Sequence, residues 1–410
     1  MSDQSNFSRR QFIGGAVATS AAVFTASSPF AAEQPGGASA SQRKIKLGVI
    51  GLGGRGSWLA KLFQKHGGYE IHGVADYFPE VAQGAGKAFG VDKSRQFSGL
   101  SGYKKLYGSG IEAVAIEDVP YFYAEQAAAA VEAGLHVYMA KPIAVDVPSC
   151  LAIGAAGKLA TEKKLSFLVD YQLPLEPAVI EVAQRVRKGA LGKLAHIVSI
   201  GFAWQGWPDP PLGPTIESRL RGEIWLSDTA LSGDTIVSYD IHIIDGVVSV
   251  LGKRPISACG MARTCRAHPN GDRTDCVGVV YQLDDGTLWT HATQSITNSF
   301  DLTTLSASLF GLEATAHIQY GGKVYVRGGK QHYSGTCGSI YDDGAIRNVA
   351  RFHKDITDGI HENPSVQRAV DGTLTALLGR EAAARRCYLT MDDLIKENKR
   401  LEVDLKGLKA

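Results

Sequence analysis

The sequence carries no excess of one charge and, past its N-terminus, no long hydrophobic run. Its 43 basic and 41 acidic residues give a formal net charge of +2, without an extended run of Lys or Arg. This balance argues against a nucleic-acid-binding protein, because such surfaces are strongly and locally basic. No stretch beyond the N-terminus is apolar over a length that could cross a bilayer. Low-complexity segments and internal repeats are also absent past residue 41.

Cysteine is sparse and unpaired in the sequence. The six cysteines are scattered, and none forms a C-x-x-C pair, so we expect neither a zinc knuckle nor a redox dithiol. Their ordinary interpretation is that of small buried apolar residues. Cys259 and Cys265 could instead bridge in an oxidising compartment. No H-E-x-x-H or comparable cluster is present either, so no metal site is expected.

Residues 1–40 have the layout of a twin-arginine export signal. Arg9 and Arg10 are adjacent, a weakly apolar, Ala-rich stretch follows over 12–26, and small residues lead up to residue 40. The alternative is a disordered tail with a chance arginine pair. The signal predicts a periplasmic or otherwise exported protein that binds its cofactor before export.

A glycine-rich loop follows the first predicted strand. Residues 45–50 read as a buried parallel strand, and the next six residues, G-L-G-G-R-G, fit the pattern G-x-G-x-x-G. In this motif the glycines permit a tight turn, close approach of a pyrophosphate and helix–strand packing, with the phosphates at a helix N-terminus. The predicted cofactor-binding residues of the loop are Gly51, Gly53, Gly54, Arg55 and Gly56.

Asp76 supports a dinucleotide site. It ends a second predicted strand, over 70–75, and follows Gly56 by twenty residues. A carboxylate there can accept hydrogen bonds from the adenosine ribose hydroxyls, and it would repel a 2′-phosphate. Tyr77, not Arg, follows it. We therefore expect NAD rather than NADP. The alternative role for Asp76 is that of a surface turn residue.

Strands and helices then alternate in a way that predicts a parallel, doubly wound sheet. The expected strands are 112–116, 136–139 and 165–169, and the expected helices are 123–133 and 149–162. From residue 173 onward, strand-like runs alternate with polar turns at 196–202, 277–282, 287–293 and 316–319, and the last sixty residues are largely helical.

Four segments carry a family resemblance. They are A-K-P at 140–142, V-D-Y-Q at 169–172, S-G-D-T-I-V-S-Y-D-I-H-I-I-D at 232–245 and G-R-E-A-A at 379–383. In this order the chain resembles the glucose–fructose oxidoreductase/inositol dehydrogenase/MocA (Gfo/Idh/MocA) family. The resemblance implies an NAD-binding Rossmann domain over 44–172. It also implies a substrate and oligomerisation domain over 173–410, an α/β domain with a large open, mostly antiparallel sheet. Terminal helices would return to the Rossmann domain, in a homo-oligomer that acts on small carbohydrates.

The implied chemistry is hydride transfer between a sugar carbinol carbon and a tightly bound nicotinamide. Lys141 follows a strand, where its ammonium can contact the cofactor and the reacting oxygen. His242 is the predicted acid/base, since its ordinary pKa is about 6.5. On a single helix Ser238 and His242 would share one face, with Asp245 on the same side to orient the imidazole or bind a sugar hydroxyl. The non-catalytic alternatives are that Lys141 is a solvated turn residue, His242 a structural histidine and Asp245 a surface or capping carboxylate.

The resemblance also implies substrate contacts from Tyr171 and Gln172, beside Ser238 and Asp245. The sequence departs from the family where Glu usually precedes Lys-Pro, here Ala140, and where a carboxylate usually lies four residues before the histidine, here Ser238. Two other functions stay open, the first because Asp76, Lys141 and His242 would fit it equally and the second because of the missing carboxylate at Ser238. One is a redox-neutral, NAD-dependent glycosidase on the same scaffold, and the other is a non-catalytic sugar-binding protein.

Overall fold

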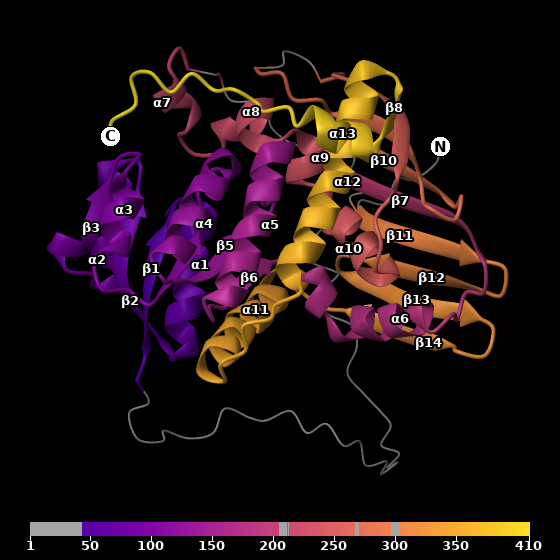
Figure 1. Ribbon diagram of the computed structural model, residues 1–410, viewed down its shortest axis with the longest axis horizontal. Helices are drawn as coiled ribbons and strands as arrows, with labels where there is room; N and C mark the ends of the chain where they lie inside the picture. Colours follow the sequence, from indigo (N-terminus) through magenta and orange to yellow (C-terminus); the bar gives the residue numbers. More distant parts are fainter. Residues whose placement is uncertain (1–42, 205–210, 212, 267–269, 297–303) are drawn as a thin grey trace, which may run out of the picture. The chain divides into compact units, whose positions relative to one another are not determined.

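The computed structural model describes residues 43–204, 211, 213–266, 270–296 and 304–410. The predicted export signal lies outside the described residues. Figure 1 shows two sheets with helices packed around them. None of the helices in the described parts of the chain combines the length and apolarity that a membrane span requires.

The first sheet has six strands in the order β3-β2-β1-β4-β5-β6, and every pairing is parallel. The strands are β1 Ile45–Ile50, β2 Tyr69–Asp76, β3 Gln96–Ser98, β4 Ala113–Ile116, β5 His136–Ala140 and β6 Phe167–Asp170. The helices among them are α1 Gly54–His66, α2 Pro79–Phe89, α3 Gly102–Tyr107, α4 Tyr123–Glu132 and α5 Val147–Glu162. The strand order reverses between β1 and β4, which opens a crevice at the carboxyl ends of these strands.

Apolar runs explain these strands. All four residues of β4 are buried, and so are all but one of those in β1, as expected for strands covered by helices on both faces. The strands predicted at 45–50, 112–116, 136–139 and 165–169 match β1, β4, β5 and β6 to within two residues. The predicted Rossmann fold class is confirmed.

The second sheet has nine strands in the order β14-β13-β12-β11-β7-β10-β9-β8-β15. All of its pairings are antiparallel except that of β7 with β10. The strands are β7 Leu194–Trp204, β8 Ser257–Arg263, β9 Cys276–Gln282, β10 Leu288–Ile296, β11 Thr304–Gly311, β12 Ala314–Gln319, β13 Gly322–Gly328, β14 Tyr333–Cys337 and β15 Tyr388–Thr390. The expected large, mostly antiparallel sheet is therefore present.

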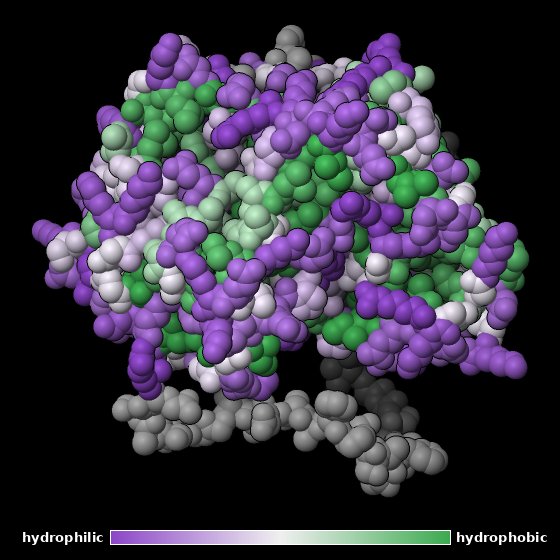
Figure 2. Space-filling view, viewed as in Figure 1, coloured by the Kyte–Doolittle hydropathy of each residue, from purple (hydrophilic) through white to green (hydrophobic). Residues whose placement is uncertain are grey.

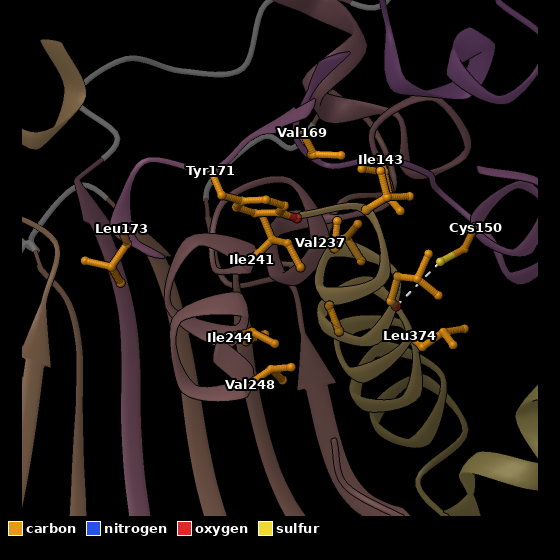
Figure 3. Close-up of a cluster of buried hydrophobic side chains, with 14 of the residues drawn as sticks. Ile143, Cys150, Val169, Tyr171, Leu173, Val237, Ile241, Ile244, Val248 and Leu374 are labelled. Carbon is orange, nitrogen blue, oxygen red and sulfur yellow. Dashed lines mark hydrogen bonds between the residues drawn. The ribbon is translucent and has the colours of Figure 1, made fainter. Parts of the chain in front are cut away.

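Helices join the two sheets. α6 Pro177–Arg187, α10 Ile241–Leu251 and α12 Ser365–Arg385 pack on the second sheet, while α11 Ile340–Thr357 packs on α1 and α12 also packs on α5. Figure 3 shows side chains from both parts meeting around Tyr171, among them Ile143, Ile241 and Leu374. This shared core fixes the carboxyl ends of the Rossmann strands against α10.

The C-terminal part is helical only in stretches. α12 is followed by β15 and by α13 Met391–Glu397, and residues 401–405 have no helical structure. Three short helices, α7 Ile216–Arg219, α8 Thr229–Ser232 and α9 Thr235–Ser238, precede α10. Figure 1 draws the final segment, in yellow, passing α8 and α7.

Candidate active site

The glycine loop has the geometry of a phosphate cradle. Gly51 has φ +76°, and a Cβ on it would lie 2.6 Å from the backbone that follows β4. A Cβ on Gly56 would lie 1.8 Å from the carbonyl oxygen of Gly51. At Gly53 and Gly54, by contrast, a Cβ would meet no atom within 4 Å. The backbone is thus bare where α1 begins, and the amides of a first helical turn have no partner within the helix.

A cavity of about 650 Å³ lies beside this loop, at the ends of β1 and β2. Asp76 lines it, together with Tyr77, Asp118 and Gln126. One oxygen of Asp76 accepts a hydrogen bond from the amide of Leu52 (2.8 Å) and the other from that of Phe78 (2.9 Å). Each oxygen keeps a lone pair for a further donor, such as a ribose hydroxyl. The bare backbone and the cavity fit a dinucleotide.

Arg55 points to carboxylates rather than to the cradle. It forms an ion pair with Asp170, at the end of β6, and its Nε lies 3.2 Å from Glu117 Oε2, after β4. Its guanidinium also lies over the rings of Trp58 and Tyr341, 5.4 and 5.2 Å from their centroids. Burial works against the charged form, yet the two carboxylates raise the pKa of Arg55 well above its ordinary value.

Glu117 is a buried acid that the Arg55 charge does not fully compensate. Its side chain is 1% exposed, and its oxygens have no hydrogen-bond partner among the described residues. Burial raises the pKa of Glu117 to about 8, against the attraction of Arg55. One cation balances one carboxylate here, and Asp170 also accepts from Asn348 (2.5 Å) and Gln172 (3.2 Å). Glu117 is therefore mainly protonated at neutral pH.

Lys141 lies directly after β5, at the same sheet edge. Its Nζ donates a hydrogen bond to the carbonyl oxygen of Ser238, 2.8 Å away. Burial, with a contribution from the Arg55 cation, lowers the pKa of Lys141 to about 7. The amine can therefore gain or lose a proton near neutral pH. Ser238 is thus brought to Lys141 through its backbone.

The predicted single helix over 232–245 is wrong. α9 ends at Ser238 and α10 begins at Ile241, so Ser238 and His242 do not share a helical face. The cause is Asp240, which lies between the two helices. Its buried carboxylate bonds to His291 (2.9 Å) and to Thr293, both on β10, instead of capping the helix.

His242 is buried at the start of α10. Its ring centroid lies 4.7 Å from that of Tyr320, and its Nδ1 has no hydrogen-bond partner in the described parts of the chain. Burial first, and then the Lys141 cation, hold the pKa of His242 well below its ordinary value. His242 is therefore a neutral imidazole at neutral pH.

Asp245 does not orient His242. Its Oδ1 lies 3.2 Å from Nε of Arg368 on α12, because a carboxylate with no solvent exposure needs a nearby cation. The prediction that it holds the imidazole is corrected by this pairing. Tyr171, 1% exposed, packs in the core drawn in Figure 3 rather than lining the cavity.

Gln172 links the two halves of the site. Its amide nitrogen donates to Asp170, and its Oε1 accepts a hydrogen bond from the Tyr320 hydroxyl at 3.1 Å. Since Tyr320 contacts the His242 ring, a chain of contacts runs from Arg55 through these residues to the imidazole. Sequence reasoning missed Glu117, Asp170 and Tyr320. Glu117 and Asp170 could have been predicted from their positions at the carboxyl ends of strands. Tyr320 comes from the second sheet, and no sequence pattern points to it.

The cysteine pair is also corrected. The sulfur atoms of Cys265 and Cys276 lie 3.5 Å apart, so the partner of Cys265 is not Cys259. With Asp275 they form a group whose potential ligand atoms all lie within 4.8 Å. The Asp275 oxygens already accept from the amides of Cys265 (2.7 Å) and Arg266 (2.9 Å), which leaves two neighbouring thiols.

Comparison with known proteins identifies the first domain. Residues 45–171 match the sequence model of the Gfo/Idh/MocA oxidoreductase family, described as an NAD-binding Rossmann fold. Residues 45–171 are thus similar to the Rossmann domain of that family. Levoglucosan dehydrogenase of Pseudarthrobacter phenanthrenivorans is 26% identical over 193 residues, which cover 46% of this chain and 47% of that protein. A glycosyl hydrolase family 109 protein of Shewanella pealeana is 27% identical over 157 residues, covering 37% and 34%.

The likeness to solved structures extends further along the chain. The structure of a levoglucosan dehydrogenase in complex with NADH superimposes with a TM-score of 0.70 at 19% identity. The superposition covers 85% of this chain and 99% of the other. At that identity the likeness shows the fold alone. The curated relatives above are matched over less than half of their length.

Proposed function

We propose that this chain is an oxidoreductase that transfers a hydride between NAD and a sugar or sugar-like polyol. One observation carries the proposal. A chain of ion-pair, hydrogen-bond and ring contacts joins Arg55, at the glycine loop, to His242 on α10, and Lys141 lies at the same sheet edge. Several of the polar atoms there, including His242 Nδ1 and Glu117 Oε1, lack partners among the described residues. Such a cluster is expected where a ligand completes the hydrogen bonding.

NAD, when bound, supplies the hydride acceptor. His242 is neutral, and its Nδ1, which has no partner among the described residues, can accept the proton of a substrate hydroxyl. Lys141, with a pKa of about 7, can donate a hydrogen bond to the same substrate oxygen while that oxygen loses its proton to His242. Glu117, protonated at neutral pH, is a further proton store beside these two groups. Gln172 acts as a positioning residue through Tyr320.

The cofactor preference rests on Asp76. Its position on the cavity wall suits the ribose hydroxyls of NAD, and the tyrosine after it offers no cation to a 2′-phosphate. The relatives act, by their names, on levoglucosan or as glycosyl hydrolases, which favours a small carbohydrate substrate. We also propose that the cofactor stays bound, because twin-arginine export to the periplasm would carry the protein away from free NAD.

The test has two arms. Protein isolated natively is denatured, and the supernatant is assayed for NAD; an empty supernatant and no binding of added NAD would refute the proposal. In the second arm, levoglucosan, inositols and aldoses are screened for NADH formation with wild type, Lys141→Met and His242→Asn. Both variants should lose turnover at least 100-fold while they retain NAD, and exposed Lys158→Met serves as the control.

The glycosidase relative favours a second candidate. In this reaction a sugar is oxidised transiently, the aglycone is eliminated, and the product is reduced again. Release of nitrophenol from an aryl glycoside without net NADH would support this candidate over the dehydrogenase. Export is tested separately, since replacing Arg9 and Arg10 by Lys should retain the protein in the cytoplasm.

A further inference from the structure

The segment after α13 is extended and one-sided. Its sequence L-E-V-D-L-K alternates apolar and charged residues over 401–406. Leu401, Val403 and Leu405 are half-buried, whereas the charged residues between them are exposed. Figure 1 shows this segment, in yellow, running above α8 and α7, and Figure 2 shows hydrophilic and hydrophobic atoms side by side along the same path. The segment therefore covers something apolar with one face.

What it covers is the rim of the candidate cofactor site. Val403, Leu405 and Leu408 pack on a cluster that includes Phe78, two residues after β2, and Leu231 of α8. This cluster lies at the carboxyl edge of the Rossmann sheet, where a dinucleotide would lie. The segment is thus joined to the site by apolar contact.

Backbone hydrogen bonds hold the segment at both ends. The amide of Leu401 donates to Asp146 Oδ2 at 2.9 Å. Near the other end, the carbonyl of Lys409 accepts from the amide of Leu100 at 2.9 Å, and its own amide donates to the Tyr77 hydroxyl at 3.1 Å. Gly99, with φ +85°, allows this approach, because a Cβ there would lie 2.3 Å from the carbonyl oxygen of residue 410.

The same segment lines the cavity. Arg400, Leu405 and Ala410 share the wall of the 650 Å³ cavity with Asp76 and Tyr77. We propose that residues 400–410 form the outer wall of the adenosine subsite and slow the release of the bound dinucleotide. This inference rests on the proposed function. An adenosine between Asp76 and Leu405 would lie against the segment, and these contacts would have to break before the dinucleotide leaves.

The test is the release rate of NADH from the full-length protein. NADH-loaded wild type, Leu405→Ala and the exposed neighbour Lys406→Ala are mixed with excess NAD, and the loss of bound NADH fluorescence is followed. Leu405→Ala should release NADH roughly tenfold faster, as expected for the loss of about 1.4 kcal/mol of apolar contact. Lys406→Ala should match wild type. Equal rates in all three proteins would overturn the inference, although the proposed function would stand.

A second measurement needs no variant. Trypsin can cut after Arg400, Lys406 and Lys409, which are exposed. Saturating ADP-ribose, which carries the adenosine, the diphosphate and the second ribose but no nicotinamide, should slow these cuts in wild type by about tenfold, as for a segment that the ligand holds in place. Unchanged cleavage with bound ADP-ribose would refute the outer wall. Absence of any NADH or ADP-ribose binding to wild type would instead refute the proposed function, and this inference with it.

Discussion

Replacing Lys141 should make the folded protein more stable while it abolishes turnover. Burial holds the pKa of Lys141 at about 7, against an ordinary 10.5. Between these two pH values the unfolded chain holds a proton that the folded protein lacks. The free energy of unfolding therefore rises with pH in this window, by up to about 1.4 kcal/mol per pH unit. Below about pH 7 the full penalty applies, and it vanishes above about pH 10.5.

Lys141→Met removes this penalty. The stability advantage of the variant over wild type should then be larger at pH 7 than at pH 9, by up to about 2 kcal/mol. The lost hydrogen bond to Ser238 shifts the whole difference by a constant, so it does not affect the slope. Glu117 changes the difference in the same sense, because without the nearby cation it holds its proton more tightly.

The assay is chemical unfolding, followed by circular dichroism at pH 7, 8 and 9, with the m-values compared to confirm equal exposure on unfolding. Lys158→Met, which removes an exposed lysine from α5, is the matched control for the loss of one positive charge. A difference between Lys141→Met and wild type that stays constant from pH 7 to 9 would refute the reasoning. It would mean that the amine keeps its charge in the folded protein throughout this range.

Three further predictions follow from the contacts. Gly56→Ala should weaken NAD binding at least tenfold, measured by calorimetry, since its methyl group would meet the carbonyl oxygen of the turn at 1.8 Å; unchanged affinity would contradict the cradle. Arg368→Met should lower the free energy of unfolding by about 3–5 kcal/mol, because it leaves Asp245 buried without a cation, yet kcat of the folded fraction should persist; a selective loss of kcat would restore a catalytic role for Asp245. Oxidised glutathione should convert Cys265 and Cys276 to a disulfide, taking two electrons and two protons from the thiols, and thiol titration before and after treatment should show two fewer thiols.

The sequence was most informative where local rules decide. Apolar runs predicted five of the six Rossmann strands in the right places, all but the short β3, and G-x-G-x-x-G with Asp76 located the cradle and the cavity wall. Both depend on short-range geometry, namely the alternation of elements and the spacing from Gly56. These features were predictable because no distant residue needs to be known.

The rest depends on residues far apart in the chain. The Arg55 side chain pairs with Asp170, 115 residues away, instead of lying in the glycine loop. No sequence pattern near Arg55 predicts that partner. The break before α10 arises because Asp240 finds His291, 51 residues on. The alternation after α13 was visible in the sequence, but only the folded chain shows that Leu405 reaches the cavity.

Because Asp240 is bonded to β10, substitutions on that strand should affect the position of His242 from a distance. His242 lies two residues after Asp240, whose carboxylate is bonded to β10 of the second sheet. The position of the imidazole therefore depends on that sheet as well as on α10. A change at Thr293, on a strand that does not line the cavity, should displace His242 relative to Lys141. Substitutions in the second sheet should therefore alter the geometry of the candidate site without replacing any of its own residues.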